Sequence, residues 1–205
     1  MSRIIYLMGK SSSGKDTIFK ELLRHSITEA GLVQPEKIVP YTTRPIRAGE
    51  RDGEEYYFTD EAGFQKWQEK GRIIEDRAYH TCHGLWRYFT VDDGQIKTGD
   101  HLYITIGTLE AYSRMRERFG EETMLPVMIE LDDGVRLQRA LDREKAQTHP
   151  KYEEMCRRFL ADSSDFSEEK LALAGIERRF QNDDLQRCLA EITAYIRAEI
   201  DGAGR

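Results

Sequence analysis

The order of apolar and polar stretches along the chain predicts strands and helices that follow one another. The run from Ile4 to Met8 is continuously apolar, which is typical of a strand buried on both faces of a sheet. Small and polar residues follow from Gly9 to Gly14, and from Lys15 to Arg24 the apolar residues recur at the spacing of an amphipathic helix. We therefore expect the chain to open with a strand, a loop and a helix.

A second alternation of strand, helix and strand lies in the middle of the sequence. Leu102–Ile106 and Leu125–Leu131 are apolar runs of strand length, and Thr108–Phe119 between them has helical spacing. Because strands joined by helices run in the same direction, this pattern predicts an α/β protein with a parallel sheet. Three further helices are expected at residues 60–70, 133–143 and 185–200.

Three other regions have a weaker pattern. Residues 41–57 are expected to form loops and short strands, and residues 72–91 irregular strands. Residues 144–150 are polar and interrupt the helical spacing. From there to about residue 167 the chain is charged and poorly periodic, as in a mobile segment.

Length and composition favour one compact domain. The chain has 205 residues, of which 39% are hydrophobic and 33% are charged, and these values are ordinary for a globular protein. We expect one domain made of a core at residues 1–38 and 98–205, an inserted lobe at residues 39–97 and a lid at about residues 143–165.

Charge and cysteine content limit the partners and the location. A net charge of −6 argues against nucleic-acid and anionic-membrane partners, because both require a basic surface. The apolar run at Ile4–Met8 is far shorter than the ~20 residues that span a bilayer. Three widely spaced cysteines suit a reducing compartment. We expect a cytoplasmic protein, a monomer or homodimer, that binds small molecules.

The first informative motif is Gly-Lys-Ser-Ser-Ser-Gly-Lys-Asp-Thr at residues 9–17, which fits the phosphate-loop pattern G-x-x-x-x-G-K. Glycines and small residues let successive backbone N–H groups point into one concavity, and the next helix presents its first N–H groups to the same anion. A Gly- and Ser-rich turn is the alternative, but the flanking strand and helix favour the phosphate loop. The predicted ATP-binding residues are Gly9, Lys10, Ser11, Ser12, Ser13, Gly14, Lys15, Asp16 and Thr17.

Asp16 departs from the usual pattern, in which Ser or Thr follows the lysine. The usual hydroxyl helps to hold Mg²⁺ beside the phosphates. Asp16 and Thr17 are both candidates for this role, with Mg²⁺ as the cofactor and ATP as the co-substrate. Lys15 is predicted to be catalytic because it places a positive charge against the outer phosphates.

The second informative stretch runs from Thr42 to Phe58. Arg44 and Arg47 are three residues apart, and the proline after Arg44 stiffens the chain, so the two side chains can hold a phosphate from two sides. Tyr56 adds a hydroxyl donor. An exposed basic loop is the alternative.

Together with the phosphate loop, the pattern T-T-R-x-x-R-x-G-E-x-x-G-x-x-Y from Thr42 to Tyr56 resembles the guanylate kinases. The similarity continues through Ile73-Ile74-Glu75 to Asn182-Asp183-Asp184-Leu185. This resemblance implies a P-loop kinase core with a five-stranded parallel sheet, an inserted mixed-strand acceptor-binding lobe and a helical lid that closes on ATP. It also implies phosphoryl transfer from ATP to GMP or dGMP.

The resemblance assigns roles to individual positions. Arg44, Arg47 and Tyr56 match the residues that bind the phosphate of the acceptor. Glu75 matches the carboxylate that accepts hydrogen bonds from the guanine edge, and Asn182 stands where the family approaches the adenine of ATP.

Phosphoryl transfer also needs positive charge on the transferring group. Arg143 and Arg158 lie nearest the lid positions of the family and are the predicted catalytic arginines. Arg139 and Arg157 are further candidates, and a solvated helix face is the alternative for Arg157 and Arg158.

Other positions depart from the family and leave the acceptor open. His83-Gly84-Leu85 stands where the family has Tyr-Gly and a hydroxyl residue, and Thr105 and Gly107 replace two aspartates. His83 and Thr105 are the predicted acceptor-binding residues at these places.

Some of these features are shared with a second family. The run Ile5–Gly9, the Gly-Lys-Asp ending of the phosphate loop and Leu125-Pro126-Val127 resemble the ribose 1,5-bisphosphate phosphokinases. Three functions therefore stay open: a guanylate kinase, a kinase of the same fold acting on ribose 1,5-bisphosphate or another phosphorylated acceptor, and a non-catalytic guanylate kinase-like binding module. The complete loop with Lys15 speaks against the third.

Overall fold

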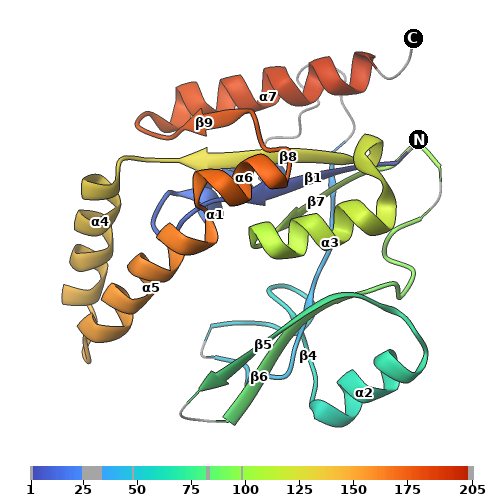
Figure 1. Ribbon diagram of the computed structural model, residues 1–205, viewed down its shortest axis with the longest axis horizontal. Helices are drawn as coiled ribbons and strands as arrows, with labels where there is room; N and C mark the ends of the chain where they lie inside the picture. The colour runs from blue at the N-terminus through green and yellow to red at the C-terminus, as the bar shows by residue number, and fades with distance from the viewer. Residues whose placement is uncertain (1, 25–33, 48, 82–83, 98, 203–205) are drawn as a thin grey trace.

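Two β-sheets and the helices packed on them make up the computed structural model, which describes residues 2–24, 34–47, 49–81, 84–97 and 99–202 (Figure 1). The larger sheet has five strands in the order β2–β7–β1–β8–β9, and all neighbouring pairs are parallel. Its strands are β1 (Arg3–Met8), β2 (Glu36–Lys37), β7 (Leu102–Ile106), β8 (Met124–Glu130) and β9 (Arg179–Gln181). The predicted α/β fold with a five-stranded parallel sheet is confirmed.

Helices cover both faces of this sheet, which explains why its central strand is apolar from Ile4 to Met8. The helices α1 (Lys15–Arg24) and α7 (Leu185–Gly202) pack on one face, and α3 (Leu109–Phe119) and α6 (Glu168–Leu173) on the other. Successive side chains of a strand point to opposite faces. Accordingly, Ile5 and Leu7 belong to the first core cluster, and Ile4, Tyr6 and Met8 belong to the second.

The smaller sheet is mixed and has the strand order β4–β3–β6–β5. Its strands are β3 (Tyr41–Thr42), β4 (Tyr57–Phe58), β5 (Ile73–Thr81) and β6 (Gly84–Val91). With α2 (Glu61–Glu69) it lies below the large sheet in Figure 1. Helix α2 begins after Asp60, whose carboxylate accepts the N–H of Gly63 at 2.7 Å.

The strands expected at residues 72–91 are present, and they are more regular than expected. β5 and β6 form a long antiparallel hairpin with one shift of register between Ile73 and Glu75. One side of this pair of strands packs on α2, where Phe89 of β6 contacts Phe64, and an aromatic residue such as Phe89 is typical of strands. Charged residues among the apolar positions of β5 and β6 made the alternation of apolar and polar residues difficult to recognise in the sequence.

Most of the poorly periodic segment up to residue 167 is helical, and its mobility stays a prediction. After α4 (Asp133–Lys145), residues of this segment form α5 (Tyr152–Asp165), and both helices extend from one end of the large sheet in Figure 1. None of the side chains of α5 is fully buried. A helix without a buried stripe leaves a weak hydrophobic period in the sequence.

The short strands β3 and β4 agree with the expectation for residues 41–57, whereas three other short elements were not predicted. β2 and β9 have two and three residues, and a single 3₁₀ turn, η2, covers Glu121–Thr123. Segments of this length carry too few positions for a period to be recognised. The division into core, acceptor-binding lobe and lid stays a prediction.

The carboxyl ends of the parallel strands meet at one edge of the large sheet. The chain leaves β1 at Gly9, β7 at Gly107, β8 at Leu131 and β9 at Asn182. Ligands of open α/β sheets bind outside this edge. Within the described ranges, no helix has the length and apolar character that crossing a membrane requires.

Replacing Ile192 by alanine is expected to lower the free energy of unfolding by about 2–5 kcal/mol, because the fully buried side chain of α7 would leave a cavity against the sheet. Chemical denaturation followed by circular dichroism measures the change. Leu173→Ala is the control, since Leu173 is 81% exposed and its loss should change stability by no more than about 0.5 kcal/mol. Equal losses in the two variants would contradict the assignment of the core.

Candidate functional site

The loop between β1 and α1 has a backbone that only small residues allow. Gly9 and Gly14 have φ angles of 152° and 90°, and Ser12 has a φ of 63°. A Cβ atom on Gly9 would stand 2.5 Å from the carbonyl oxygen of Ile129. One on Gly14 would stand 2.2 Å from the side-chain nitrogen of Asn182. Both glycines of the motif are therefore required by the local geometry.

Two hydroxyls in this loop are buried without a partner. The Oγ atoms of Ser12 and Ser13 are buried, and neither makes a hydrogen bond within the described part of the chain. Buried polar atoms normally find partners, so such an orphan calls for an explanation. A bound phosphate oxygen would accept from these hydroxyls, which makes the loop fit the anion that its motif predicts.

Asn182 supports this loop from the neighbouring strand end. Its side chain is 5% exposed and donates to the carbonyl oxygen of Ser13 at 2.7 Å, while its backbone N–H donates to Glu130 at 2.8 Å. The amide thus positions the phosphate loop itself. A contact of Asn182 with ATP stays a prediction.

Lys15, Asp16 and Thr17 form the start of α1. Asp16 and Thr17 are exposed, and the ammonium of Lys15 lies 3.7 Å from the carboxylate of Asp16. Carboxylate and hydroxyl oxygens are the hard donors that Mg²⁺ takes. The donor set at the N-terminus of α1 is therefore of the right chemistry for Mg²⁺ bound with ATP. Lys10, on the other side of the loop, lies 3.6 Å from Asp133 of α4.

In the smaller sheet, Arg44 is buried and held by Glu50. Its two terminal nitrogens donate to the two carboxylate oxygens at 2.7 and 2.6 Å, and the rings of Tyr56 and Phe58 lie 5.0 and 5.4 Å from the guanidinium carbon. These hydrogen bonds hold the pKa of Glu50 below its ordinary value. Burial raises the pKa of the Tyr56 hydroxyl, which therefore stays a donor.

Arg47 is exposed, and its backbone N–H donates to the same Glu50 at 2.8 Å. Glu50 thus arranges both predicted acceptor arginines, although the sequence showed it only as part of the motif. The structure brings Arg44, Glu50 and Tyr56 together, and the side chain of Arg47 stays at the surface. Their binding of an acceptor phosphate stays a prediction.

Glu75 lies on β5 with both carboxylate oxygens occupied. Its side chain is 2% exposed, and it accepts from Thr90 Oγ1 at 2.7 Å and from Arg77 Nε at 3.1 Å. Arg77 also donates to Thr108 Oγ1 at 3.3 Å and so joins the smaller sheet to the end of β7. Burial acts to lower the pKa of Arg77, but the charge of Glu75, the nearby Tyr6 and Tyr79 and the hydrogen bond to Glu75 together outweigh burial, and the pKa is raised.

Thr105 and Gly107, at the end of β7, have different surroundings. Thr105 is buried, and its hydroxyl lies 3.5 Å from the carbonyl oxygen of Ile38, beyond the usual range of a hydroxyl hydrogen bond. Gly107 lies against Tyr6, because a Cβ atom there would stand 2.0 Å from the tyrosine hydroxyl. That hydroxyl donates to the carbonyl oxygen of Thr108 at 3.1 Å, and burial raises its pKa. An acceptor contact of Thr105 stays a prediction, and His83 lies outside the described residues.

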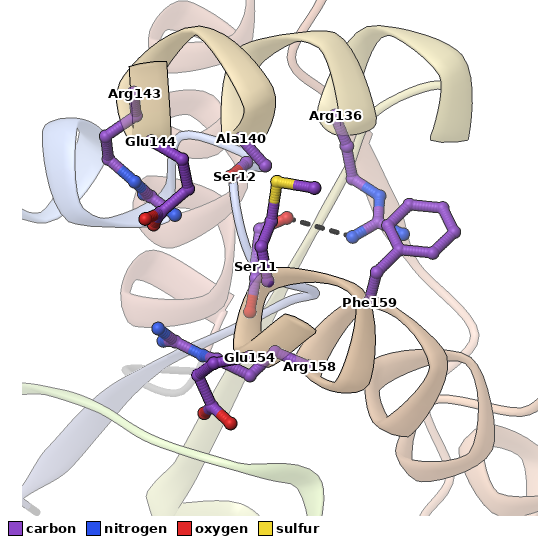
Figure 2. Close-up of a pocket in the computed structure, with 10 residues that line it drawn as sticks. Ser11, Ser12, Arg136, Ala140, Arg143, Glu144, Glu154, Arg158 and Phe159 are labelled. Carbon is purple, nitrogen blue, oxygen red and sulfur yellow. Dashed lines mark hydrogen bonds between the residues drawn. The ribbon is translucent and has the colours of Figure 1, made fainter. Parts of the chain in front are cut away.

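A pocket between the phosphate loop and the helices α4 and α5 contains the predicted catalytic arginines. Arg143 from α4 and Arg158 from α5 line it together with Ser11 and Ser12 (Figure 2). Of the other candidates, Arg157 is exposed and pairs with Glu154 at 2.7 and 2.8 Å. The guanidinium of Arg139 lies 3.8 Å from the position that a Cβ atom on Gly14 would take.

Sequence reasoning missed four polar residues of these sites. Arg77 is two residues from Glu75 on the same strand, so the period of two places both on one face and could have indicated the pair. Thr90, on β6, is the residue that pairs with Glu75 across the two strands. Arg136 and Asp162 contact Ser11 from α4 and α5, and no local pattern connects positions so far apart in the sequence.

Comparison with known proteins gives the same family throughout. A family model described as guanylate kinase matches residues 1–84. The guanylate kinase of Chlorobaculum tepidum is 31% identical over 151 residues, which are 71% of this chain and 71% of that protein. The guanylate kinase of Aromatoleum aromaticum is 27% identical over 202 residues, 95% of this chain and 87% of that protein.

Another similarity is stronger in identity but confined to a shorter part of the chain. The guanylate kinase of Thermobifida fusca is 41% identical over 75 residues, which are 36% of this chain and 34% of that protein. Among solved structures, the guanylate kinase of Anaplasma phagocytophilum superposes with a TM-score of 0.61 at 22% identity, covering 97% of this chain and 86% of that one. At this identity the superposition shows the fold alone.

Replacing Asn182 by alanine is expected to weaken ATP binding, because the carbonyl oxygen of Ser13 loses its donor and the loop loses its support. An unsatisfied buried acceptor costs about 1–3 kcal/mol, so we expect an affinity loss of about tenfold. Isothermal titration with MgATP measures it. Asp183→Ala, at the exposed neighbour, is the control, and equal affinities in the two variants would rule out the supporting role.

Proposed function

Because this chain belongs to the guanylate kinase family, we propose that it transfers the γ-phosphoryl group of ATP to GMP or dGMP, giving ADP and the nucleoside diphosphate. It is an ATP-dependent nucleotide kinase. The identity of the acceptor, GMP or dGMP, is what we propose beyond the family.

One observation carries the proposal: the turn between β1 and α1 combines two required glycines with two buried hydroxyls that have no partner among the described residues. This turn stands at the carboxyl edge of the sheet, at the N-terminus of α1 and next to Arg143 and Arg158. Such a combination is suited to the phosphates of ATP. It has no evident use in a protein that only binds another protein.

The acceptor side supports GMP through Glu75 and the arginine pair. The carboxylate of Glu75 is nearly buried, and its orientation is fixed by Thr90 and Arg77. A site built around a buried acceptor rejects a base that lacks matching donors, and guanine offers N–H groups on one edge. Arg44 and Arg47 are arranged by Glu50 to hold the phosphate that is to be extended.

The reaction requires positioning and charge more than covalent help from the protein. An oxygen of the acceptor phosphate attacks the γ-phosphorus of ATP, and the bond from that phosphorus to the β–γ bridging oxygen breaks, so that ADP leaves. Lys15 and the N–H groups of the loop hold the donor phosphates. Arg143 and Arg158 face the charge that spreads over the transferring oxygens. Asp16 and Thr17 would hold Mg²⁺, which would further neutralise the donor phosphates when bound.

A second acceptor class is favoured by one specific observation. Both oxygens of Glu75 already have partners, and Tyr6 fills the space beside Gly107. A guanine edge would have to share Glu75 with Arg77, whereas an acceptor without a base makes no such demand. The alternative is therefore a kinase of the same chemistry that acts on a phosphorylated sugar such as ribose 1,5-bisphosphate.

The acceptor assay that tests the proposal measures ADP release with MgATP and, in turn, GMP, dGMP, AMP, UMP and ribose 1,5-bisphosphate. We expect turnover with GMP or dGMP only. Lys15→Ala is the control variant, which should retain the fold and release no ADP. Turnover of the sugar bisphosphate in place of GMP would overturn the acceptor assignment, and an inactive parent with every acceptor would overturn the kinase assignment.

Replacing Glu75 by glutamine should lower kcat/KM for GMP by a factor of about 10² or more, because the amide presents a donor where the base requires an acceptor. The affinity for MgATP should stay at the parental value. Asp76→Asn is the matched control, since Asp76 is the next residue on β5 and its side chain is 40% exposed. A parallel loss of GMP use and ATP affinity in Glu75→Gln would mean that Glu75 only stabilises the fold.

A further inference from the structure

Helix α5 carries Arg158 to the pocket beside the phosphate loop, yet little apolar burial holds the helix there. None of its side chains is fully buried, and Leu160 is 69% exposed. Because the hydrophobic contribution to packing scales with the apolar area removed from water, burial fixes α5 only weakly. Polar contacts must therefore determine where Arg158 stands.

Two charged side chains join α5 and α4 to a single residue of the loop. Asp162 Oδ2, from α5, accepts the backbone N–H of Ser11 at 2.7 Å. Arg136 Nη1, from α4, donates to the carbonyl oxygen of Ser11 at 2.9 Å and lies 3.5 Å from Asp162 Oδ2. Figure 2 shows Arg136 reaching Ser11, with Phe159 of α5 beside its guanidinium. We call the contacts among Ser11, Arg136 and Asp162 the α5 clamp.

The clamp is rigid because Arg136 has little freedom. Its side chain is 1% exposed, and that of Asp162 is 16% exposed. Asp133 accepts from Arg136 Nε at 3.0 Å and from Nη2 at 2.8 Å, and the ring of Phe159 lies 4.8 Å from the guanidinium. A charge removed from water is kept only where its donors are paired, so these partners fix the guanidinium in one position.

The clamp also acts on the most strained part of the loop. Ser12, directly after Ser11, has a φ of 63°, a left-handed conformation that a serine adopts at an energetic cost. Such conformations persist where the surrounding structure holds them. Because Ser11 is held at both its N–H and its C=O, the chain enters Ser12 in a fixed direction.

We propose that Arg136 and Asp162 are positioning residues for phosphoryl transfer. The clamp fixes the phosphate loop at Ser11 and, in the same network, orients α5 so that Arg158 faces the transferring group. This inference rests on the proposed kinase function. Arg136 and Asp162 lie outside the sequence motifs, and they couple the phosphate loop to helix α5, which carries Arg158.

The first test compares Asp162→Ala with Asp165→Ala in the full chain. Asp165 is the matched control, since it lies on the same helix and is 61% exposed, with Lys170 as its partner at 3.9 Å. Asp162→Ala leaves Arg136 paired with Asp133, so the variant should fold. We expect kcat or the affinity for MgATP to fall by about 10-fold to 100-fold, with the KM for the acceptor unchanged, because a small misplacement of catalytic groups has this effect. Asp165→Ala should behave as the parent.

The second test separates positioning from stability. In Arg136→Leu with Asp162→Leu, the buried pair becomes apolar, a change that is often neutral or stabilising. The double variant should unfold at a temperature close to that of the parent and still show the loss in kcat or in MgATP affinity.

The value of kcat and the affinity for MgATP decide the outcome together. A loss of about threefold or more in either quantity, in Asp162→Ala and in the double variant, supports the clamp. If both quantities change by less than about threefold in either variant, the clamp is only structural and the proposal is overturned. The affinity for MgATP can be measured without an acceptor. If the parent protein phosphorylates none of the tested acceptors, this affinity alone decides the test of the clamp. Failure of the proposed function is then distinct from failure of the clamp.

Discussion

The backbone of the loop between β1 and α1 is the constraint on which the rest of the site depends. Gly9 is pressed against the carbonyl of Ile129, and Gly14 against Asn182, so neither position accepts a side chain. The loop leaves the hydroxyls of Ser12 and Ser13 buried and unpaired within the described structure. A protein accepts this arrangement at a cost in stability, and an anion bound in the loop offsets that cost.

The parallel sheet places the other groups around this loop. Because β1, β7, β8 and β9 end at one edge, the residues that follow them are neighbours although they are far apart in the sequence. Asn182 reaches Ser13 from β9, and Thr108 receives Arg77 from the smaller sheet. The contact of Arg77 with Thr108 joins the acceptor side to the donor edge. Arg77 also donates to Glu75, so the proposed function assigns the choice of acceptor to the Glu75–Arg77 pair.

The sequence predicted those elements whose burial imposes a period. β1 lies between helices and is therefore apolar from Ile4 to Met8, and α1 and α3 each present one apolar face. Helix α5 could not be recognised in this way, since it buries no side chain fully and is held by Asp162 and neighbouring polar contacts. Likewise, β2 and β9 are too short to show alternation.

The candidate site divides in the same manner. The phosphate loop and the Arg44 stretch are each continuous in the sequence, so the spacing of the first and the resemblance of the second to the guanylate kinases could indicate them. By contrast, the contacts of Ser11 with Arg136 and Asp162 span separations of 125 and 151 residues, and only the folded chain brings them together. Tyr6 and Gly107 are another such pair. The ring of Tyr6, on β1, takes the space that a side chain at residue 107 would need, directly after the neighbouring strand β7.

The most direct measurement of the central claim is the response of backbone amide resonances to MgATP in the isotopically labelled protein. The account predicts that the largest shifts fall on the amides of the loop from Ser12 to Thr17, together with Asn182, and that the exposed end of α7 is unaffected. Shifts confined to other surfaces, with the loop amides unchanged at saturating MgATP, would contradict it.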